Sequence, residues 1–305
     1  MSTAYIFPGQ GSQTVGMGGD WLGRNALVQQ TFDEADAALG EKLSDVILKG
    51  PIEDLTRTEN TQPALLTVSV AYWRVLEAEG LLPDVVAGHS LGEYSALVCA
   101  GALDFADAVR LTRLRGQAMQ SAVPVGVGSM AAILRIDEPD ALQALIDAAT
   151  EPGQVLEPAG FNTVGQVVIA GHVEAVQKAV ALAREHNGIG KELNVSAPFH
   201  CSLLAAAGEA LGEALADVTI NPLAFPYVPN VTGEWTENPS AADVRSNLVD
   251  QVCKAVRWLP GMRSMVGHGV DKWLEVGSGR TLVGLLKRMD RKANLSTFES
   301  ESWKS

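Results

Sequence analysis

The stretch AGHSLGEYSALVCAGAL, residues 87–103, places one serine, Ser90, between Gly88 and Gly92. The apolar run 84–87 before it predicts a buried strand, and the apolar run 91–100 after it predicts a buried helix. A strand that enters G-x-S-x-G and leaves as a helix is the context of a nucleophile elbow. We therefore interpret Ser90 as a nucleophile; the alternative is a serine that only caps the helix.

The chemistry of such an elbow depends on the backbone as well as the hydroxyl. A helix that begins beyond Ser90 points free N–H groups at the site, so the amide of Leu91 is predicted to face an oxyanion. The loop FPGQGSQ, residues 7–13, follows a predicted strand at 4–7 and can supply a second N–H from Gln10. Two donors of this kind would stabilise the negative charge that forms when a serine attacks a carbonyl group.

Two glycine-rich stretches were compared with the dinucleotide-binding pattern. In the loop from Phe7, the third glycine of GxGxxG is replaced by Thr14. The stretch GVGSMA, residues 126–131, matches GxGxxA, but a strand rather than a helix is predicted to follow it. No helix N-terminus would then meet a pyrophosphate, so no nucleotide site is predicted.

A serine nucleophile needs a base, and the chain has five histidines: His89, His172, His186, His200 and His268. His89 adjoins Ser90, and adjacent side chains on a turn usually diverge. His200 lies in SAPFHC, residues 196–201, between a predicted strand and a predicted helix, where catalytic groups often lie. This position favours His200 over the other four without deciding the matter.

Composition limits the classes of function. The 305 residues include 23 Lys and Arg against 36 Asp and Glu, a formal net charge of −13, which argues against a general nucleic-acid-binding protein. A hydrophobic content of 47% is typical of a soluble globular protein. Cys99, Cys201 and Cys253 form no CxxC pair, so neither disulfides nor a metal site is predicted and a cytoplasmic location is expected. No secretory signal and no apolar run of membrane-spanning length is found.

The order of elements predicts an α/β fold with a parallel sheet. Strands are expected at 4–7, 84–87 and 270–276, and helices at 61–80, 91–100, 104–122, 201–216 and 282–291. The order of predicted strands and helices changes after Pro124. Strands expected at 129–136, 166–170 and 191–196, with helices at 139–149 and 173–186, suggest a small βαββαβ-like insert. The predicted organisation is a catalytic core of residues 1–124 and 197–305, interrupted by an insert of residues 125–196.

The helix expected at 104–122 carries Arg110, Arg113 and Arg115. We interpret Arg110 and Arg113 as solvated helical arginines. The residues alone leave open whether Arg115 is a third solvated arginine or a ligand-binding group.

Six motifs in order give the chain a resemblance to one family. They are FPGQGSQTVGMG (7–18), TQPALL (61–66), GHSLGEYSALVCAGAL (88–103), RGQAMQ (115–120), VSAPFH (195–200) and EVGSGRTLVGLLKR (275–288). Together they resemble the malonyl-CoA:acyl-carrier-protein transacylases of type II fatty acid synthesis, over essentially the whole chain. The resemblance implies an α/β-hydrolase-like core with a parallel sheet, interrupted by a small ferredoxin-like α+β subdomain.

The same resemblance implies a role for each matching residue. Ser90 would carry the acyl group and His200 would be the general base and then the acid, with the amides of Gln10 and Leu91 as oxyanion hole. Arg115 would hold the free carboxylate of the malonyl group, and the main-chain carbonyl of Gln251 would orient the histidine in a dyad without a third carboxylate. Positions lining the pocket match Gln62, Asn162 and Phe199, the last resembling the pattern of enzymes selective for malonyl over methylmalonyl.

Two loops depart from the family pattern. Asn162-Thr163-Val164-Gly165-Gln166 stands where the family often has Asn-Ser-Pro-x-Gln, which bears on the pocket role of Asn162. The late GPG-type turn is Gly277-Ser278-Gly279 in this chain.

The implied activity is transfer of a malonyl group from malonyl-CoA to the phosphopantetheine thiol of acyl carrier protein, without a resident cofactor or metal and by a protein expected to be a monomer. The alternatives are a serine thioesterase or hydrolase acting on acyl-CoA, a polyketide-pathway acyltransferase, and a non-catalytic binding module. For the carrier protein, the candidate docking residues are basic: Lys191, Arg280, Lys287, Arg288, Arg291 and Lys292. A solvated basic helix end is the alternative interpretation of the last five.

Overall fold

A computed structural model describes residues 2–136 and 138–299. Its central sheet has five strands in the order β7-β2-β1-β8-β9. They are β1 (Ser2–Phe7), β2 (Val85–Gly88), β7 (Tyr227–Val228), β8 (Val270–Val276) and β9 (Asn294–Phe298). Every pairing is parallel, so the carboxyl ends of all five strands meet at one edge of the sheet.

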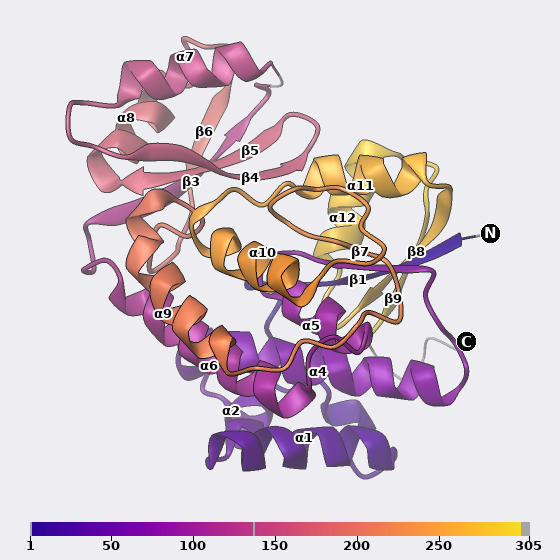
Figure 1. Cartoon of the computed structure of the whole chain (residues 1–305). Coiled ribbons are helices and arrows are strands. Elements are labelled where there is room, and N and C mark those ends of the chain that lie inside the picture. Colours follow the sequence, from indigo (N-terminus) through magenta and orange to yellow (C-terminus); the bar gives the residue numbers. More distant parts are fainter. Residues whose placement is uncertain (1, 137, 300–305) are drawn as a thin grey trace.

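Both faces of this sheet are buried, as expected for parallel strands covered by helices (Figure 1). In β1, Tyr5 and Phe7 belong to the larger apolar cluster, while Ala4 and Ile6 belong to a second cluster on the opposite face. The first face packs against α4 (Thr58–Ala78) and α5 (Gly92–Cys99), and the second against α11 (Trp258–Gly267) and α12 (Thr281–Met289).

The remaining helices of the core surround these layers. They are α1 (Ala26–Leu39), α2 (Leu43–Lys49), α3 (Ile52–Thr56), α6 (Phe105–Ser121), α9 (Ala205–Ala216) and α10 (Ala241–Cys253), with 3-10 turns η1 (Gly19–Trp21) and η2 (Ser202–Leu204). Asp104 caps α6 by accepting hydrogen bonds from the first turn, and Ser240 with Asp243 forms a capping box on α10. No helix in the described ranges combines the length and hydropathy needed to cross a bilayer.

A second sheet of four antiparallel strands stands at one end of the molecule (Figure 1). Its order is β4-β5-β3-β6, with β3 (Gly128–Leu134), β4 (Leu156–Thr163), β5 (Gln166–His172) and β6 (Ile189–Glu192). The helices α7 (Pro139–Ala149) and α8 (Val173–Leu182) complete the order βαββαβ. The α/β architecture with a parallel sheet and a small ferredoxin-like antiparallel sheet is therefore confirmed.

The strands of this second sheet face two environments. Along β5, Val167 and Ile169 pack in a separate apolar cluster with α7 and α8, whereas Val168 and Ala170 pack with the core of the larger part. The period of two in a strand thus divides one apolar run between two hydrophobic clusters.

Several predicted elements differ from those observed. No strand was predicted at β4, where register shifts follow Pro158 and Phe161. The strand expected at 191–196 lies at β6, two residues earlier, and the helix expected from Cys201 begins with the turn η2. The predicted domain limits fall a few residues outside the second sheet, and they stay a prediction because strand ends alone do not define a domain.

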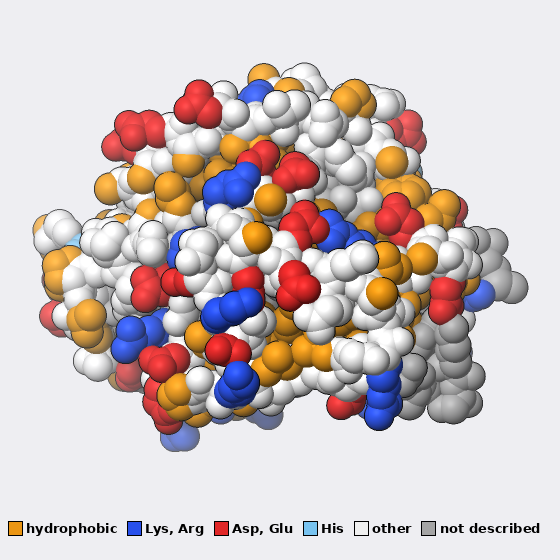
Figure 2. Space-filling view, turned by 90° about the horizontal axis from the view of Figure 1, so that it is seen from below, with side chains coloured by type: hydrophobic (Ala, Val, Ile, Leu, Met, Phe, Trp, Pro, Cys, Tyr) orange, Lys and Arg blue, Asp and Glu red, His pale blue; other side chains and the backbone are white. Residues whose placement is uncertain are grey.

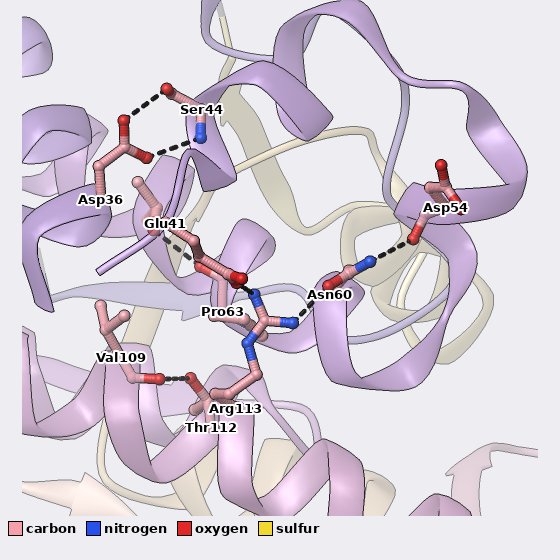
Figure 3. A network of polar contacts seen from close by, with 10 residues as sticks. Asp36, Glu41, Ser44, Asp54, Asn60, Pro63, Val109, Thr112 and Arg113 are labelled. Carbon is pink, nitrogen blue, oxygen red and sulfur yellow. Dashed lines mark hydrogen bonds and ion pairs between the residues drawn. The ribbon is translucent and has the colours of Figure 1, made fainter. Parts of the chain in front are cut away.

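The helix α6 shows that neighbouring arginines can have different roles. Arg113 donates to Glu41 and to Asn60, and its side chain is only 14% exposed, so the prediction of a solvated Arg113 was wrong (Figure 3). Arg110 is about half exposed and pairs with Asp107 one turn earlier. Arg113 therefore joins α6 to α4 and to the segment that follows α1.

The face in Figure 2 mixes charges of both signs. Lys and Arg side chains alternate there with Asp and Glu, and apolar side chains are exposed between them. This face offers no extended basic surface of the kind that binds a nucleic acid backbone.

Candidate active site

The turn between β2 and α5 is sharp and holds Ser90 in the left-handed region, with φ of 53°. A Cβ on Gly88 would lie 1.9 Å from the backbone of Gly92, and a Cβ on Gly92 would lie 2.0 Å from the carbonyl oxygen of Phe7. Both positions therefore require glycine, and the spacing G-x-S-x-G follows from this packing. Ser90 lies before the helix and Leu91 occupies the N-cap position without a side-chain cap, so Ser90 is not a simple capping residue.

Ser90 and His200 are brought together from distant parts of the chain. Ser90 Oγ lies 2.7 Å from Nε2 of His200, and Nδ1 of His200 lies 2.6 Å from the main-chain oxygen of Gln251. A carbonyl oxygen only accepts hydrogen bonds, so Nδ1 carries the proton and Nε2 is free to accept the serine hydroxyl. The geometry is that of a serine with a base in hydrogen-bond reach.

Burial and charge keep the histidine neutral. Burial, followed by the nearby Arg115 guanidinium, lowers the pKa of His200 to about 3. His200 is 7% exposed and, like Ser90, has a positive φ, of 63°. The imidazole is therefore in its basic form at neutral pH.

The backbone N–H groups of Gln10 and Leu91 are candidate donors to an oxyanion at Ser90. Within the described ranges, neither the N–H of Gln10 nor that of Leu91 donates to a protein acceptor. By contrast, the N–H of Ser90 donates to Oδ1 of Asn230 at 2.6 Å. Gln10 follows the end of β1 and Leu91 follows the end of β2, so both amides lie at the carboxyl edge of the sheet.

Arg115, at 1% exposure, is the largest of the fully buried side chains that the structure describes. Its Nη1 donates to Oε1 of Gln62 at 2.7 Å, and its Nη2 donates to Oε1 of Gln251 at 2.8 Å and to Ser90 Oγ at 3.2 Å. Burial lowers the pKa of Arg115, but a guanidinium keeps its charge in proteins. Among the described residues, no carboxylate forms an ion pair with Arg115.

A cavity of about 190 Å³ opens beside these groups and is lined from two sides. The core contributes Gln10, Gln62, His89, Ser90, Arg115, Met119, Phe199 and His200. The segment with the second sheet contributes Met130, Ala159, Gly160, Asn162, Val168, Leu193 and Val195. The predicted pocket residues Gln62, Asn162 and Phe199 therefore all line one cavity with Ser90.

Asn162 contacts a side chain that was not predicted to matter. Its Oδ1 lies 2.8 Å from Nε2 of His89, and burial lowers the pKa of His89. His89 thus directs one ring nitrogen toward β4, while the hydroxyl of Ser90 bonds to His200. His172 and His268 bond to backbone groups elsewhere, His172 to the N–H of Val155 and His268 to the carbonyl of Ser264.

Asn230 and Glu93 form hydrogen bonds that hold the site together, and neither residue was predicted from the sequence. Asn230 accepts from the N–H of Ser90 and donates to the carbonyl of Gly88 at 2.6 Å. Glu93 accepts from the side chain of Gln251 and from the N–H of Asn230. Glu93 had a signal, since it is a carboxylate inside an apolar helix sequence, but Asn230 lies in a loop without a motif.

The described ranges hold no group of three or more His, Cys, Asp or Glu that could bind a metal ion. The chemistry available to the arranged residues is proton transfer by imidazole, nucleophilic attack by a hydroxyl and hydrogen bonding to an anion.

An α/β fold with a serine–histidine pair and free amides at the carboxyl edge of its sheet is the arrangement of enzymes that form acyl esters on serine. The chain belongs to the acyl transferase domain family, whose model matches residues 4–267. Its curated relatives include the malonyl CoA-acyl carrier protein transacylase of Escherichia coli K12, with 48% identity over 94% of this chain and 92% of that protein. The Bacillus subtilis 168 transacylase of the same name is 44% identical over 95% of this chain and 90% of its own length.

The chain is also similar in fold to solved structures of transacylases. An acyl carrier protein S-malonyltransferase from Vibrio cholerae is 42% identical, with a TM-score of 0.95 over 100% of this chain and 99% of that one. A malonyl-transacylase solved in complex with a type II PKS acyl-carrier protein is 41% identical, with a TM-score of 0.94. The match covers 99% of this chain and 97% of that one.

Proposed function

We propose that the protein transfers the malonyl group of malonyl-CoA to the phosphopantetheine thiol of an acyl carrier protein, through a malonyl ester on Ser90. The observation that carries the proposal is the buried Arg115, which pairs with no carboxylate within residues 2–136 and 138–299 and lies within 3.2 Å of the Ser90 hydroxyl that His200 also contacts. A cation held beside a nucleophile favours an acyl group with a free carboxylate.

The first half of the reaction forms the ester. His200 Nε2 takes the proton of Ser90 Oγ as the oxygen attacks the thioester carbon. The oxyanion is stabilised by the amides of Gln10 and Leu91, each worth about a hundred- to a thousandfold in rate for comparable donors. The C–S bond then breaks, and His200 gives its proton to the sulfur of CoA.

The second half reverses these roles. The carrier thiol gives its proton to His200 and its sulfur attacks the ester carbon. The bond between that carbon and Ser90 Oγ breaks, and the proton returns to the serine. The enzyme is thus regenerated without a resident cofactor, because CoA and phosphopantetheine enter and leave with the substrates.

Two observations favour this proposal over the thioesterase alternative. The histidine donates to a main-chain carbonyl of Gln251 rather than to the carboxylate that completes a hydrolase triad. Apolar side chains from β3 and β5 line the cavity beside Ser90, which disfavours water as the acceptor.

The test is mass spectrometry of the intact protein after brief exposure to malonyl-CoA. We expect one malonyl group on the peptide that contains Ser90, absent in Ser90→Ala and present in the control Ser95→Ala. The Ser95 hydroxyl is buried on α5, the helix that follows Ser90, and has no hydrogen-bond partner among the described residues. Adding carrier protein whose phosphopantetheine arm ends in a free thiol should remove the group faster than water does. Equal loss to water and thiol would instead favour a thioesterase, and no acylation at all would overturn the proposal.

Phe199 supports a finer selectivity. It is 8% exposed and lines the cavity next to His200, so we infer that its ring crowds an α-methyl group. One methyl group is worth about 1–3 kcal/mol, which gives preference for malonyl over methylmalonyl rather than exclusion. An unchanged ratio of the two substrates in Phe199→Ala would remove this role.

The carrier protein is proposed to dock on the basic residues of α12 and its flanks. Arg280, Lys287 and Arg291 line a surface cavity of about 410 Å³, and Arg288 reaches the second sheet by donating to Gln166 at 2.9 Å. Lys287→Glu with Arg288→Glu should raise the Michaelis constant for carrier protein, whereas Lys42→Glu with Lys49→Glu, on α2 and its N-cap, should not. An unchanged constant in the first pair would exclude this surface.

A further inference from the structure

The buried carboxylate of Glu93 has no part in the proposed reaction. Glu93 lies in the first turn of α5 and is 1% exposed. Its Oε2 accepts from Nε2 of Gln251 at 2.6 Å and from the N–H of Asn230 at 3.1 Å, while its Oε1 has no partner in the described ranges. Burying a carboxylate without an ion pair is costly, so its presence needs an explanation beyond packing.

The side-chain amide of Gln251 is held in one orientation by this carboxylate. Nε2 of Gln251 donates to Glu93 and to the carbonyl of Ser90 at 3.0 Å, and Oε1 accepts from Nη2 of Arg115 at 2.8 Å. A reversed amide would place its oxygen against the carboxylate and its NH₂ group against the guanidinium. Both contacts would be repulsive, so Glu93 selects the orientation in which Gln251 accepts from Arg115.

We propose that Glu93 is a positioning residue for acyl-group selectivity, which acts through the side chain of Gln251 to hold the guanidinium of Arg115 toward Ser90 Oγ. The inference rests on the proposed function, in which Arg115 binds the free carboxylate of the malonyl group. It adds a residue that touches neither the substrate nor the reacting atoms.

The side-chain amide of Gln251 separates Glu93 from Arg115. This separation allows the guanidinium to be oriented while its donors stay available to a ligand. A carboxylate in direct contact with Arg115 would occupy the donors that a malonyl group requires. Gln62 and Gln251 instead hold the guanidinium through neutral oxygens, and Glu93 supplies negative charge behind Gln251. The cation is therefore oriented and partly compensated while its charge stays available to a ligand.

Opposing effects act on the negative charge of Glu93. Burial raises the pKa of Glu93 to about 7, and the hydrogen bonds from Gln251 and Asn230 with the charge of Arg115 oppose that rise. Among the described residues, Tyr94 on its own helix and Tyr227 on β7 also interact with Glu93 electrostatically. A bound malonyl carboxylate would add a second negative charge near Glu93.

The experiment compares acylation by malonyl-CoA and acetyl-CoA in Glu93→Ala, Glu93→Gln and Glu93→Asp. Glu93→Ala removes the acceptor of Gln251, so we expect kcat/KM for malonyl-CoA to fall at least tenfold more than that for acetyl-CoA. Glu93→Gln keeps an acceptor oxygen and should recover most of the malonyl preference. Glu93→Asp withdraws the carboxylate by one methylene, and we expect an intermediate loss that still tests the proposal if the alanine variant does not fold.

Two further variants separate positioning from a general structural role. In an Arg115→Ala background, adding Glu93→Ala should change the malonyl-to-acetyl ratio less than twofold. Glu275→Gln is the matched control, because Glu275 is a buried carboxylate whose pKa burial also raises to about 7, but it accepts from the N–H groups of Leu282 and Val283 on α12. It should leave the ratio unchanged.

The outcomes that overturn the inference are specific. Equal losses for both substrates in Glu93→Ala and Glu93→Asp, or an undiminished ratio change without Arg115, would show a structural role only. If the wild-type protein forms no malonyl ester on Ser90, the proposed function fails first, and the two failures are thereby distinguished.

Discussion

The two walls of the cavity are built from opposite chemistry. The core wall carries the polar groups Ser90, His200 and Arg115, each held by hydrogen bonds to other buried groups. The wall from the second sheet is mostly apolar, with Met130 from β3 and Val168 from β5. In the proposed reaction the core supplies the reacting groups, whereas the apolar wall from the second sheet would exclude water and strengthen the electrostatic contacts within the cavity.

The backbone shows the same division. Ser90 and His200, both in the core, adopt positive φ values that non-glycine residues rarely adopt, and both meet at the proposed reacting oxygen. In the second sheet and its helices, the non-glycine residues with positive φ are Arg135 and Asn187, which lie in connections beyond β3 and α8. Unusual backbone geometry thus coincides with the proposed chemistry only in the core.

The largest expected effect comes from breaking the core wall. His200→Ala removes the base that Ser90 contacts, and general-base catalysis typically contributes about a hundred- to ten-thousandfold in rate. We expect a loss of that order in acylation, measured in single-turnover experiments with malonyl-CoA. His268→Ala, a surface histidine bonded to the carbonyl of Ser264, is the control and should keep the wild-type rate. A His200→Ala protein with normal acylation would disprove the assigned base.

The second prediction concerns a substitution in the apolar cluster between α7, α8 and the second sheet. Leu145 is fully buried on α7 among apolar residues away from the cavity, and a Leu→Ala change at such a site costs about 2–5 kcal/mol of unfolding free energy. Denaturant unfolding should show this loss in Leu145→Ala, while the acylation rate of the folded protein stays within about twofold, because Leu145 does not line the cavity. Activity that falls in proportion to stability would mean that the second sheet also positions the reacting groups.

The third prediction tests the charge in the core wall. A charged hydrogen bond contributes about 1.5–3 kcal/mol, so Arg115→Ala should lower the malonyl-to-acetyl preference by roughly ten- to more than a hundredfold, inverting it toward uncharged acyl groups. Arg113→Ala is a matched control two residues away, where the side chain contacts Glu41 and Asn60 instead (Figure 3). It should alter stability and leave selectivity unchanged. Kinetics of Arg115→Ala that retain the wild-type ratio would refute the carboxylate-binding role.

Local rules predicted the parts of the fold that depend on short-range sequence. The bounds of β8 and α7 were predicted to the residue, because each is a clear apolar pattern with Gly269 or Pro139 at its start. The turn at Ser90 was predicted from the glycines that the close approach of β1, β2 and α5 demands. β9 was missed because its sequence NLSTF is half polar, and β4 because it contains proline and glycine.

The site itself was only partly accessible from sequence. The nucleophile followed from a motif, and loop position favoured His200 as its base without deciding among the histidines. The roles of Arg115 and Gln251 came from resemblance, since their meeting depends on tertiary contacts over long separations. The sequence does not separate Arg113 from Arg115, and only packing shows that Arg113 contacts Glu41 and Asn60 whereas Arg115 lines the cavity. The brace at Asn230 joins the chain across 140 residues and has no local pattern.

The smallest expected effect is on the pH dependence of kcat/KM, which tests how burial and charge in the core wall lower the pKa of His200. Because the pKa of His200 lies below its ordinary value of 6.5, the neutral base persists as pH falls through 6.5, and the acid limb of kcat/KM should lie below that pH. Arg115→Ala removes the second cause of this lowering, so the limb should move to higher pH. Burial, the first cause, remains, so the limb should stay below 6.5 and the rate at pH 6 should change by less than roughly fourfold.

Acetyl-CoA is the substrate for this measurement, because it lacks the carboxylate that Arg115 is proposed to bind. Glu93 also titrates in the accessible range, with a pKa raised to about 7, so each profile is repeated in Glu93→Gln. A step near pH 7 that disappears in Glu93→Gln belongs to Glu93, and the limb that remains belongs to His200. A wild-type limb at 6.5 that Arg115→Ala does not move would mean that the core wall leaves the histidine as basic as in water, contrary to its burial and charge.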